Sequence, residues 1–253
     1  MTQPEENNQG LPPELFKFDK LENSDQAHLK RVYGCLAISM FTAFAGAYIQ
    51  LYTGWLLAGI LITITASIGL IFQAGILTAI ASIGLMFWLK STSYSKENET
   101  KRLGIFAGFT FLSGMSLGSL LNNVNMVDPS IIVTAFLGTL VIFISFLLAA
   151  LYNTNRTYLY MGGFLLSTLS CMCLARLFNI FIGSRLIWEV MLYSVLFIFC
   201  AFVLYNTQLI VEKKRKGDDD YIWHSVDLFI DFIQIFRRLL IILSNKDKKK
   251  EKN

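Results

Sequence analysis

The chain has 253 residues, of which 54% are hydrophobic and only 16% are charged, and it contains 21 phenylalanines. This composition does not fit the charged surface of a soluble domain. The net charge of +4 does not indicate a nucleic-acid-binding protein, because the basic residues lie in short connections and in a C-terminal tail. We therefore expect a membrane protein that has the lipid bilayer as a partner and binds no nucleic acid.

Long runs without charge predict several membrane-crossing helices. No Asp, Glu, Lys, Arg or His occurs in the 58 residues between Arg31 and Lys90. Further uncharged runs are near or above the roughly 20 residues that cross about 30 Å of hydrocarbon as a helix. These runs are residues 103–127, 129–155, 157–175 and 190–211. Strands of a membrane barrel would alternate in polarity, so the sequence predicts an all-α, polytopic bundle of about seven transmembrane helices.

The two ends of the chain are polar. Residues 1–27 contain prolines and little apolar surface, which predicts a mobile tail. Lys30 and Arg31 precede the first span, expected at about residues 32–52, and indicate a cytosolic N-terminus. Residues 244–253 form a Lys-rich tail that the same rule places in the cytosol, and residues 28–243 form the helical bundle between the tails.

An internal repeat lies after the first span. Residues 58–72 read AGILITITASIGLIF and residues 74–87 read AGILTAIASIGLMF. The apolar stretch 55–89 would measure roughly 50 Å as one helix, which exceeds the hydrocarbon thickness. It forms either one over-long second helix or two cramped spans. We favour one crossing, because the junction at Gln73 and Gly75 has neither a charge nor a proline, and a lipid-exposed turn is not tolerated at depth.

The distribution of basic residues tests this choice, because Lys and Arg in short connections favour the cytosolic face. With one crossing in the repeat, the basic connections share one side with the start of the first span. They hold Lys90, Lys96, Lys101, Arg102, Arg156 and residues 213–216. Arg176 and Arg185, which we assign to the fifth connection, are a mild exception. The sequons at Asn98 and Asn155 would face the cytosol and stay unglycosylated.

The last apolar segment, residues 221–243, carries a single polar stripe. Its polar residues are spaced by three or four positions and therefore share one face of a helix. They are His224, Asp227, Asp231, Gln234 and Arg238. This pattern predicts a central helix that is hydrated or paired on one side. A cytosolic tail would require that this helix enters and returns; a full crossing would violate the charge rule, and the sequence leaves both paths open.

Two carboxylates of the stripe are the first candidates for a functional site. Asp227 and Asp231 are i, i+4 neighbours, and a carboxylate within a membrane is costly unless it is paired or hydrated. They would face a polar cavity and hold a cation or a proton. The alternative is the solvated face of an interfacial helix, with Arg237 or Arg238 as counter-charge. We expect no cofactor and no resident metal.

A serine-hydrolase pattern, G-x-S-x-G, occurs at Gly114, Ser116 and Gly118. It lies in an apolar helix instead of at a strand-to-helix turn, and the chain has only two histidines, His28 and His224, neither near it in sequence. Small residues at this spacing more often allow helices to pack closely. We therefore expect that the chain is not an enzyme.

Several segments together resemble the Bax inhibitor-1 family. They are HLKRVYG (28–34), AGAYI (45–49), KRLGIFAGFTFLSG (101–114), DPSI (128–131), TAFLGT (134–139), YNTQLIVEK (205–213) and the block 220–243. With the Lys-rich tail they extend over nearly all of the chain after residue 27. The resemblance implies seven helices in the endoplasmic reticulum membrane, calcium leak from that store and suppression of cell death. Other cell-death and endoplasmic reticulum membrane proteins are the implied partners.

The resemblance also implies a pH-sensitive gate, in which an aspartate of a D-T-Q motif pairs with an aspartate of the last helix. Asp231 matches the second position, but the first is Asn206, followed by Thr207 and Gln208. Unlike a carboxyl group, the amide side chain of Asn206 does not release a proton at physiological pH. We therefore predict a calcium leak that depends weakly on pH, with calcium bound transiently at Asp231. The alternative is a non-conducting scaffold that regulates apoptosis and stress signalling through protein partners.

Overall fold

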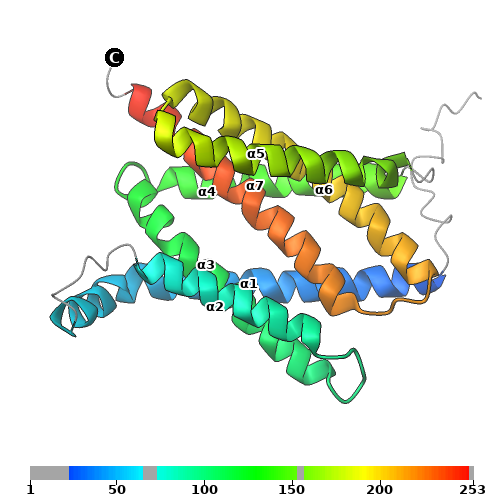
Figure 1. The fold of residues 1–253 in the computed structure, drawn as a ribbon. Coiled ribbons are helices and arrows are strands. Elements are labelled where there is room, and N and C mark those ends of the chain that lie inside the picture. The colour runs from blue at the N-terminus through cyan, green and yellow to red at the C-terminus, as the bar shows by residue number, and fades with distance from the viewer. Residues whose placement is uncertain (1–22, 65–72, 153–156, 251–253) are drawn as a thin grey trace, which may run out of the picture.

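The computed structural model of the chain describes residues 23–64, 73–152 and 157–250 (Figure 1). The helices in these ranges are α1 (Asn23–Ile64), α2 (Gln73–Ser91), α3 (Glu99–Asn125), α4 (Ser130–Tyr152), the 3-10 helix η4 (Thr157–Met161), α5 (Gly162–Ile182), α6 (Arg185–Arg215) and α7 (Tyr221–Lys250). The same ranges contain no strand, which confirms the predicted all-α class.

Five helical segments of the described chain are long and apolar enough to cross a membrane. They are Ser24–Leu51, Glu99–Asn125, Ser130–Tyr152, Tyr158–Ile182 and Arg185–Arg215. A shorter apolar helix, Ile80–Ser91, lies in α2. The length and composition of these helices indicate a multi-pass membrane protein, and the number of seven crossings stays a prediction.

The described residues of the repeat lie in two helices. α1 continues past the first span to Ile64, and α2 begins at Gln73 with the second copy. The over-long helix that we predicted at residues 55–89 stays a prediction, because its middle is not described. Residues 65–72 lie outside the described part of the chain. Residues 52–64 contain neither a charge nor a proline, and the glycines of this stretch, Gly54 and Gly59, do not end α1. α2 leads from Gln73 to the connection before α3.

α7 lies at the centre of the bundle, packed against α1, α3, α4 and α6 (Figure 1). Its apolar residues include several of the most deeply buried side chains among the described residues. These are Ile222, Val226, Leu228, Phe229, Phe232, Ile235 and Leu240. Although α7 is the most polar of the α-helices, it forms the core, because protein rather than lipid surrounds it.

Aromatic contacts fix the rotation of α7 within the bundle. The ring of Phe229 meets Phe106 and Phe109 of α3 edge to face, with centroids 6.2 and 6.0 Å apart. One turn further, Phe232 meets Phe143 of α4 in the same way at 5.5 Å. Each such pair contributes about 0.5–1.5 kcal/mol beyond the burial of its area. With two faces of α7 held by α3 and α4, the polar stripe is directed toward the remaining neighbours.

One end of the bundle, which we term the basic end, gathers the start of α1, the α2–α3 connection, the end of α6 and the start of α7. Arg102 of α3 pairs there with Asp220, and Nε of Arg215 on α6 lies 3.2 Å from Oδ2 of Asp25 on α1. The ammonium of Lys90 lies 5.9 Å from the centroid of the Trp223 ring. The basic connections described by the structure therefore share one side, as their charges predicted.

α7 passes through the bundle in one direction. At the basic end, the hydroxyl of Tyr221 donates to Oε1 of Glu99 at 2.6 Å. Toward the other end, Leu240 packs with Ile131 and Ala135 at the start of α4. Between Tyr221 and Lys250 α7 continues without turning back, which is consistent with a full crossing, one of the two paths that the sequence left open. The cytosolic location of the Lys-rich tail stays a prediction.

Candidate functional site

Asp231 lies near the middle of α7 with only 3% of its surface exposed. Its Oδ2 accepts a hydrogen bond from Nδ2 of Asn206 on α6, at 2.7 Å. The structure thus brings together the two residues that the family pattern singled out. A carboxylate withdrawn from water is costly to bury unless a partner compensates it. Here the partner is a neutral amide, which leaves the negative charge in place when the carboxylate is ionised.

The Asn206-Thr207-Gln208 motif connects α6 to two neighbours and makes one hydrogen bond within α6. Asn206 contacts α7, while the buried hydroxyl of Thr207 donates to the carbonyl of Val203 within α6 at 2.6 Å. Oε1 of Gln208 accepts from the backbone N–H of Tyr158 at 3.0 Å, at the start of η4. Side chains that satisfy otherwise unpaired groups in this way hold helices in register. The motif therefore positions α6 against both the central helix and the chain that leads into α5.

Asp227 lies one turn before Asp231 on the same face of α7 and is half-buried. The two carboxylates are close enough to act on each other electrostatically, and the cation that acts on Asp227 is Lys213 of α6. Among the described residues, neither carboxylate forms an ion pair. Two acidic groups on one face with a single amide donor create a negative potential that suits a cation.

The predicted counter-charges lie elsewhere. Nη2 of Arg237 donates to Oγ of Ser116 on α3 at 3.1 Å, and Arg238 lines a cavity between α5, α6 and α7. Arg238 is seven residues beyond Asp231, which places it about 10 Å further along the helix axis. Arg237 lies on a different face of α7. The sequence indicated correctly that charges share this helix, but the rise and rotation of the helix keep them apart.

A buried histidine pair was missed in the sequence. Nε2 of His28 on α1 lies 3.0 Å from Nδ1 of His224 on α7, and the rings meet edge to face. Nε2 of His224 lies 3.7 Å from Oδ2 of Asp218. Beside the pair, the hydroxyl of Ser225 donates to the carbonyl of Val32 at 3.0 Å. The only signal in the sequence was that both histidines lie at the starts of helices on the basic end.

The G-x-S-x-G residues lie at the contact of α1 and α3, as the packing interpretation predicted. A Cβ atom at Gly114 would overlap the carbonyl oxygen of Ala43, and one at Gly118 would overlap the side chain of Gln50. Ser116 between them accepts the hydrogen bond from Arg237. The small residues therefore allow two helix backbones to approach closely.

This arrangement defines a class of protein: a polytopic helical membrane protein with an acidic group buried on its central helix. The chain belongs to the family described as "Inhibitor of apoptosis-promoting Bax1", which matches residues 25–248. It is 50% identical over 240 residues to "Probable Bax inhibitor 1" of Paralichthys olivaceus, covering 94% of both chains. It is 48% identical to "Bax inhibitor 1" of Homo sapiens, again over 94% of both chains.

Similarity extends to a plant relative. "Bax inhibitor 1" of Arabidopsis thaliana is 39% identical over 238 residues, which cover 94% of this chain and 88% of the relative. The match therefore includes α1 to α7 and is not confined to one motif. These comparisons confirm the family that the sequence segments indicated.

Proposed function

We propose that the chain is a calcium leak channel of the endoplasmic reticulum membrane that suppresses cell death. The observation that carries the ion pathway is the buried carboxylate of Asp231, which has an amide partner and no paired cation among the described residues. Suppression of cell death rests on the family description and on the name shared by the relatives, Bax inhibitor 1. The N-terminus is cytosolic in this proposal, because the basic end carries the charges that stay on that side.

The proposed path follows the acidic face of α7, where Asp227 and Asp231 provide the oxygen ligands that calcium prefers. Calcium is cargo and not a resident metal. In the structure one hydrogen bond from Asn206 holds Asp231 against α6. A hydrogen bond to a charged group contributes only about 1.5–3 kcal/mol, so an arriving cation can replace it. Rotation of the amide would then present the carbonyl oxygen of Asn206 to the same ion.

The leak is proposed to depend weakly on pH. A pair of carboxylates that shares one proton forms a switch when that proton leaves. Asn206 has no proton to share at these pH values, so the pair with Asp231 lacks this switch. The chain is further proposed to act without a cofactor and without enzymatic activity.

Calcium efflux from proteoliposomes between about pH 5 and pH 8 tests the proposal. We expect a nearly flat profile for the parent protein, a steep one for Asn206→Asp, and at least a tenfold loss of flux for Asp231→Asn. Asn98→Asp is the matched control, because it makes the same chemical change in the α2–α3 connection and should leave the profile flat. An unaltered profile in Asn206→Asp would contradict the gating role of this position.

The scaffold alternative is distinguished by the same experiment. A scaffold conducts nothing, so the absence of flux from all variants, under conditions where a relative conducts, would reject the channel. Suppression of cell death could then be assayed separately in cells, where a scaffold would retain it in Asp231→Asn.

A further inference from the structure

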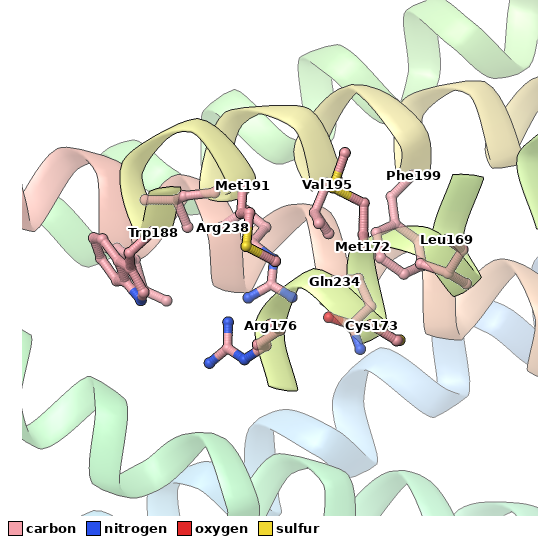
Figure 2. A pocket seen from close by; sticks show the side chains of 12 residues that line it. Leu169, Met172, Cys173, Arg176, Trp188, Met191, Val195, Phe199, Gln234 and Arg238 are labelled. Atoms are coloured by element: carbon pink, nitrogen blue, oxygen red, sulfur yellow. The ribbon is translucent and has the colours of Figure 1, made fainter. Parts of the chain in front are cut away.

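A cavity of about 300 Å³ lies between α5, α6 and α7, in the half of the bundle away from the basic end (Figure 2). Most of its wall is apolar. This part is formed by Leu169, Met172, Met191, Val195 and Phe199, with Trp188 at one side. Three polar side chains also line it, Arg176 of α5 and Gln234 and Arg238 of α7, and the remaining lining residues are Cys173, Leu192 and Ile241. The cavity is separate from the Asn206–Asp231 pair and is not used by the proposed ion path.

The cavity concentrates positive charge. Figure 2 shows the guanidinium groups of Arg176 and Arg238 pointing toward the same space. The charged groups that act on Arg238 are Arg176 and Arg237, both cations. Nε of Arg238 and Oε1 of Gln234 are buried and have no hydrogen-bond partner within the described chain. On the adjacent part of α6, Glu189 faces Arg185 at 3.9 Å. Charged side chains inside a membrane normally pair, so this cluster needs an anion.

The surroundings indicate which anion fits. Beside the cavity, α5 and the start of α6 expose large apolar side chains, including Leu177, Phe181 and Leu186. Phe181 alone is 88% exposed, as expected for a surface that faces hydrocarbon. A ligand that reaches Arg176 across this surface must itself carry hydrocarbon. Basic pockets between transmembrane helices are a known setting for anionic lipid head groups.

We propose that the cavity binds an anionic membrane phospholipid, with its phosphate between Arg176 and Arg238 and the start of one acyl chain against the apolar wall. The amide of Gln234 is placed to hydrogen-bond a head-group hydroxyl or an ester oxygen. A volume of about 300 Å³ is at the lower end for ligand pockets. It therefore holds the head-group region, while the remaining acyl chain lies on the exposed face of α5. This inference does not rest on calcium conduction.

Native mass spectrometry of the delipidated full chain tests the proposal, with phosphatidylglycerol and phosphatidylcholine of identical acyl chains as probes. Each basic side chain near an anionic head group strengthens binding about fivefold. We expect clear preference for phosphatidylglycerol, a loss of about fivefold in Arg176→Gln, and of about 30-fold in Arg176→Gln/Arg238→Gln. Arg185→Gln is the matched control, because Arg185 is highly exposed at the same end of α6 and does not line the cavity; it should bind like the parent.

Two further binding measurements distinguish a lipid head group from free phosphate as the source of the anion. Met172→Trp fills the apolar wall without changing a charge and should weaken phosphatidylglycerol binding, whereas inorganic phosphate at millimolar concentration should not displace the lipid. Arg176→Lys should recover most of the affinity lost in Arg176→Gln, because it restores the charge. Equal binding of both lipids by the parent, an equal loss in Arg185→Gln, or displacement by inorganic phosphate would each overturn the proposal.

Discussion

Nε2 of His28 lies 3.0 Å from Nδ1 of His224, so the only two histidines of the chain hold α1 against the central helix α7. His224 has no exposed surface. A neutral imidazole offers one donor and one acceptor, so one ring donates and the other accepts in this contact. Nε2 of His224, the other nitrogen of that ring, is buried and has no hydrogen-bond partner among the described residues. The contact links two helices that are separated by nearly the whole sequence, and it therefore reports on assembly of the complete bundle.

The first prediction concerns this pair. His28→Ala leaves Nδ1 of His224 buried without a partner, and an unsatisfied buried group of this kind costs about 1–3 kcal/mol. We expect a lower unfolding temperature in detergent, and a double-mutant cycle with His224→Ala should yield a coupling energy of at least about 0.5 kcal/mol. Lys30→Ala is the control, because Lys30 is exposed on the same turn of α1. Additive losses in the double variant would contradict the pairing.

The second prediction concerns the close contact of α1 and α3. Gly114→Ala would place a Cβ atom on the backbone carbonyl of Ala43, which cannot move without shifting α1. We expect a loss of about 1–3 kcal/mol in stability, the usual cost of overpacking. Gly104→Ala in the same helix is the matched control, because no atom lies within 4 Å of its added Cβ. Its effect should be neutral or stabilising by about 0.5–1 kcal/mol. Similar stabilities of the two variants, measured by thermal unfolding, would refute the packing role.

The sequence predicted the elements of the site better than their spatial relations. The spacing of polar residues was sufficient to place Asp231 on one face of a central helix, and the family pattern supplied Asn206. Neither could show that Arg238 turns into a cavity instead of pairing with Asp231. Whether Arg238 pairs with Asp231 depends on their separation along the axis of α7 and on which neighbouring helix each side chain contacts. The aromatic contacts that fix this rotation, such as Phe229 with Phe106, join segments far apart in the chain.

The position of Arg176 illustrates the same limit. We assigned it to the fifth connection, but it lies within α5, which continues to Ile182. The helix ends at Gly183, whose φ of 66° is the left-handed conformation that terminates helices. That glycine was the available signal for the true boundary. Had we ended the helix at this glycine, Arg176 would have fallen within the membrane segment. A charged side chain there requires a compensating anion.

The third prediction concerns the direction of α7. A full pass places Lys248 on the same side as Met126 of the α3–α4 turn and opposite Lys96 of the α2–α3 connection. We expect a membrane-impermeant maleimide to label Lys96→Cys from the cytosol in intact microsomes. Met126→Cys and Lys248→Cys should react only after the membrane is permeabilised. Each position is exposed in the structure, so access depends on the side. Labelling of Lys248→Cys together with Lys96→Cys in intact microsomes would mean that the last helix returns.

The fourth prediction concerns pH and the start of α4. The backbone N–H and the hydroxyl of Ser130 donate to the carboxylate of Asp128 at 2.8 Å each, and these bonds hold the pKa of Asp128 below its ordinary value. A depressed pKa means that the folded state stabilises the ionised carboxylate of Asp128. This stabilisation of the fold is fully present above the pKa of about 4 that the group has in the unfolded chain. It is lost as the pH falls through the lower, folded-state pKa.

Acidification below about pH 4 should therefore loosen the first turn of α4 in the parent protein. Asp128→Asn keeps an oxygen acceptor for the N–H of Ser130 but does not titrate, so its helix start should be insensitive over the same range. Hydrogen exchange at Ser130 to Thr134, compared between the two proteins at each pH, separates the cap from the intrinsic effect of acid on exchange. Parallel exchange profiles for parent and variant from about pH 3 to pH 7 would show that Asp128 does not cap α4 through its charge.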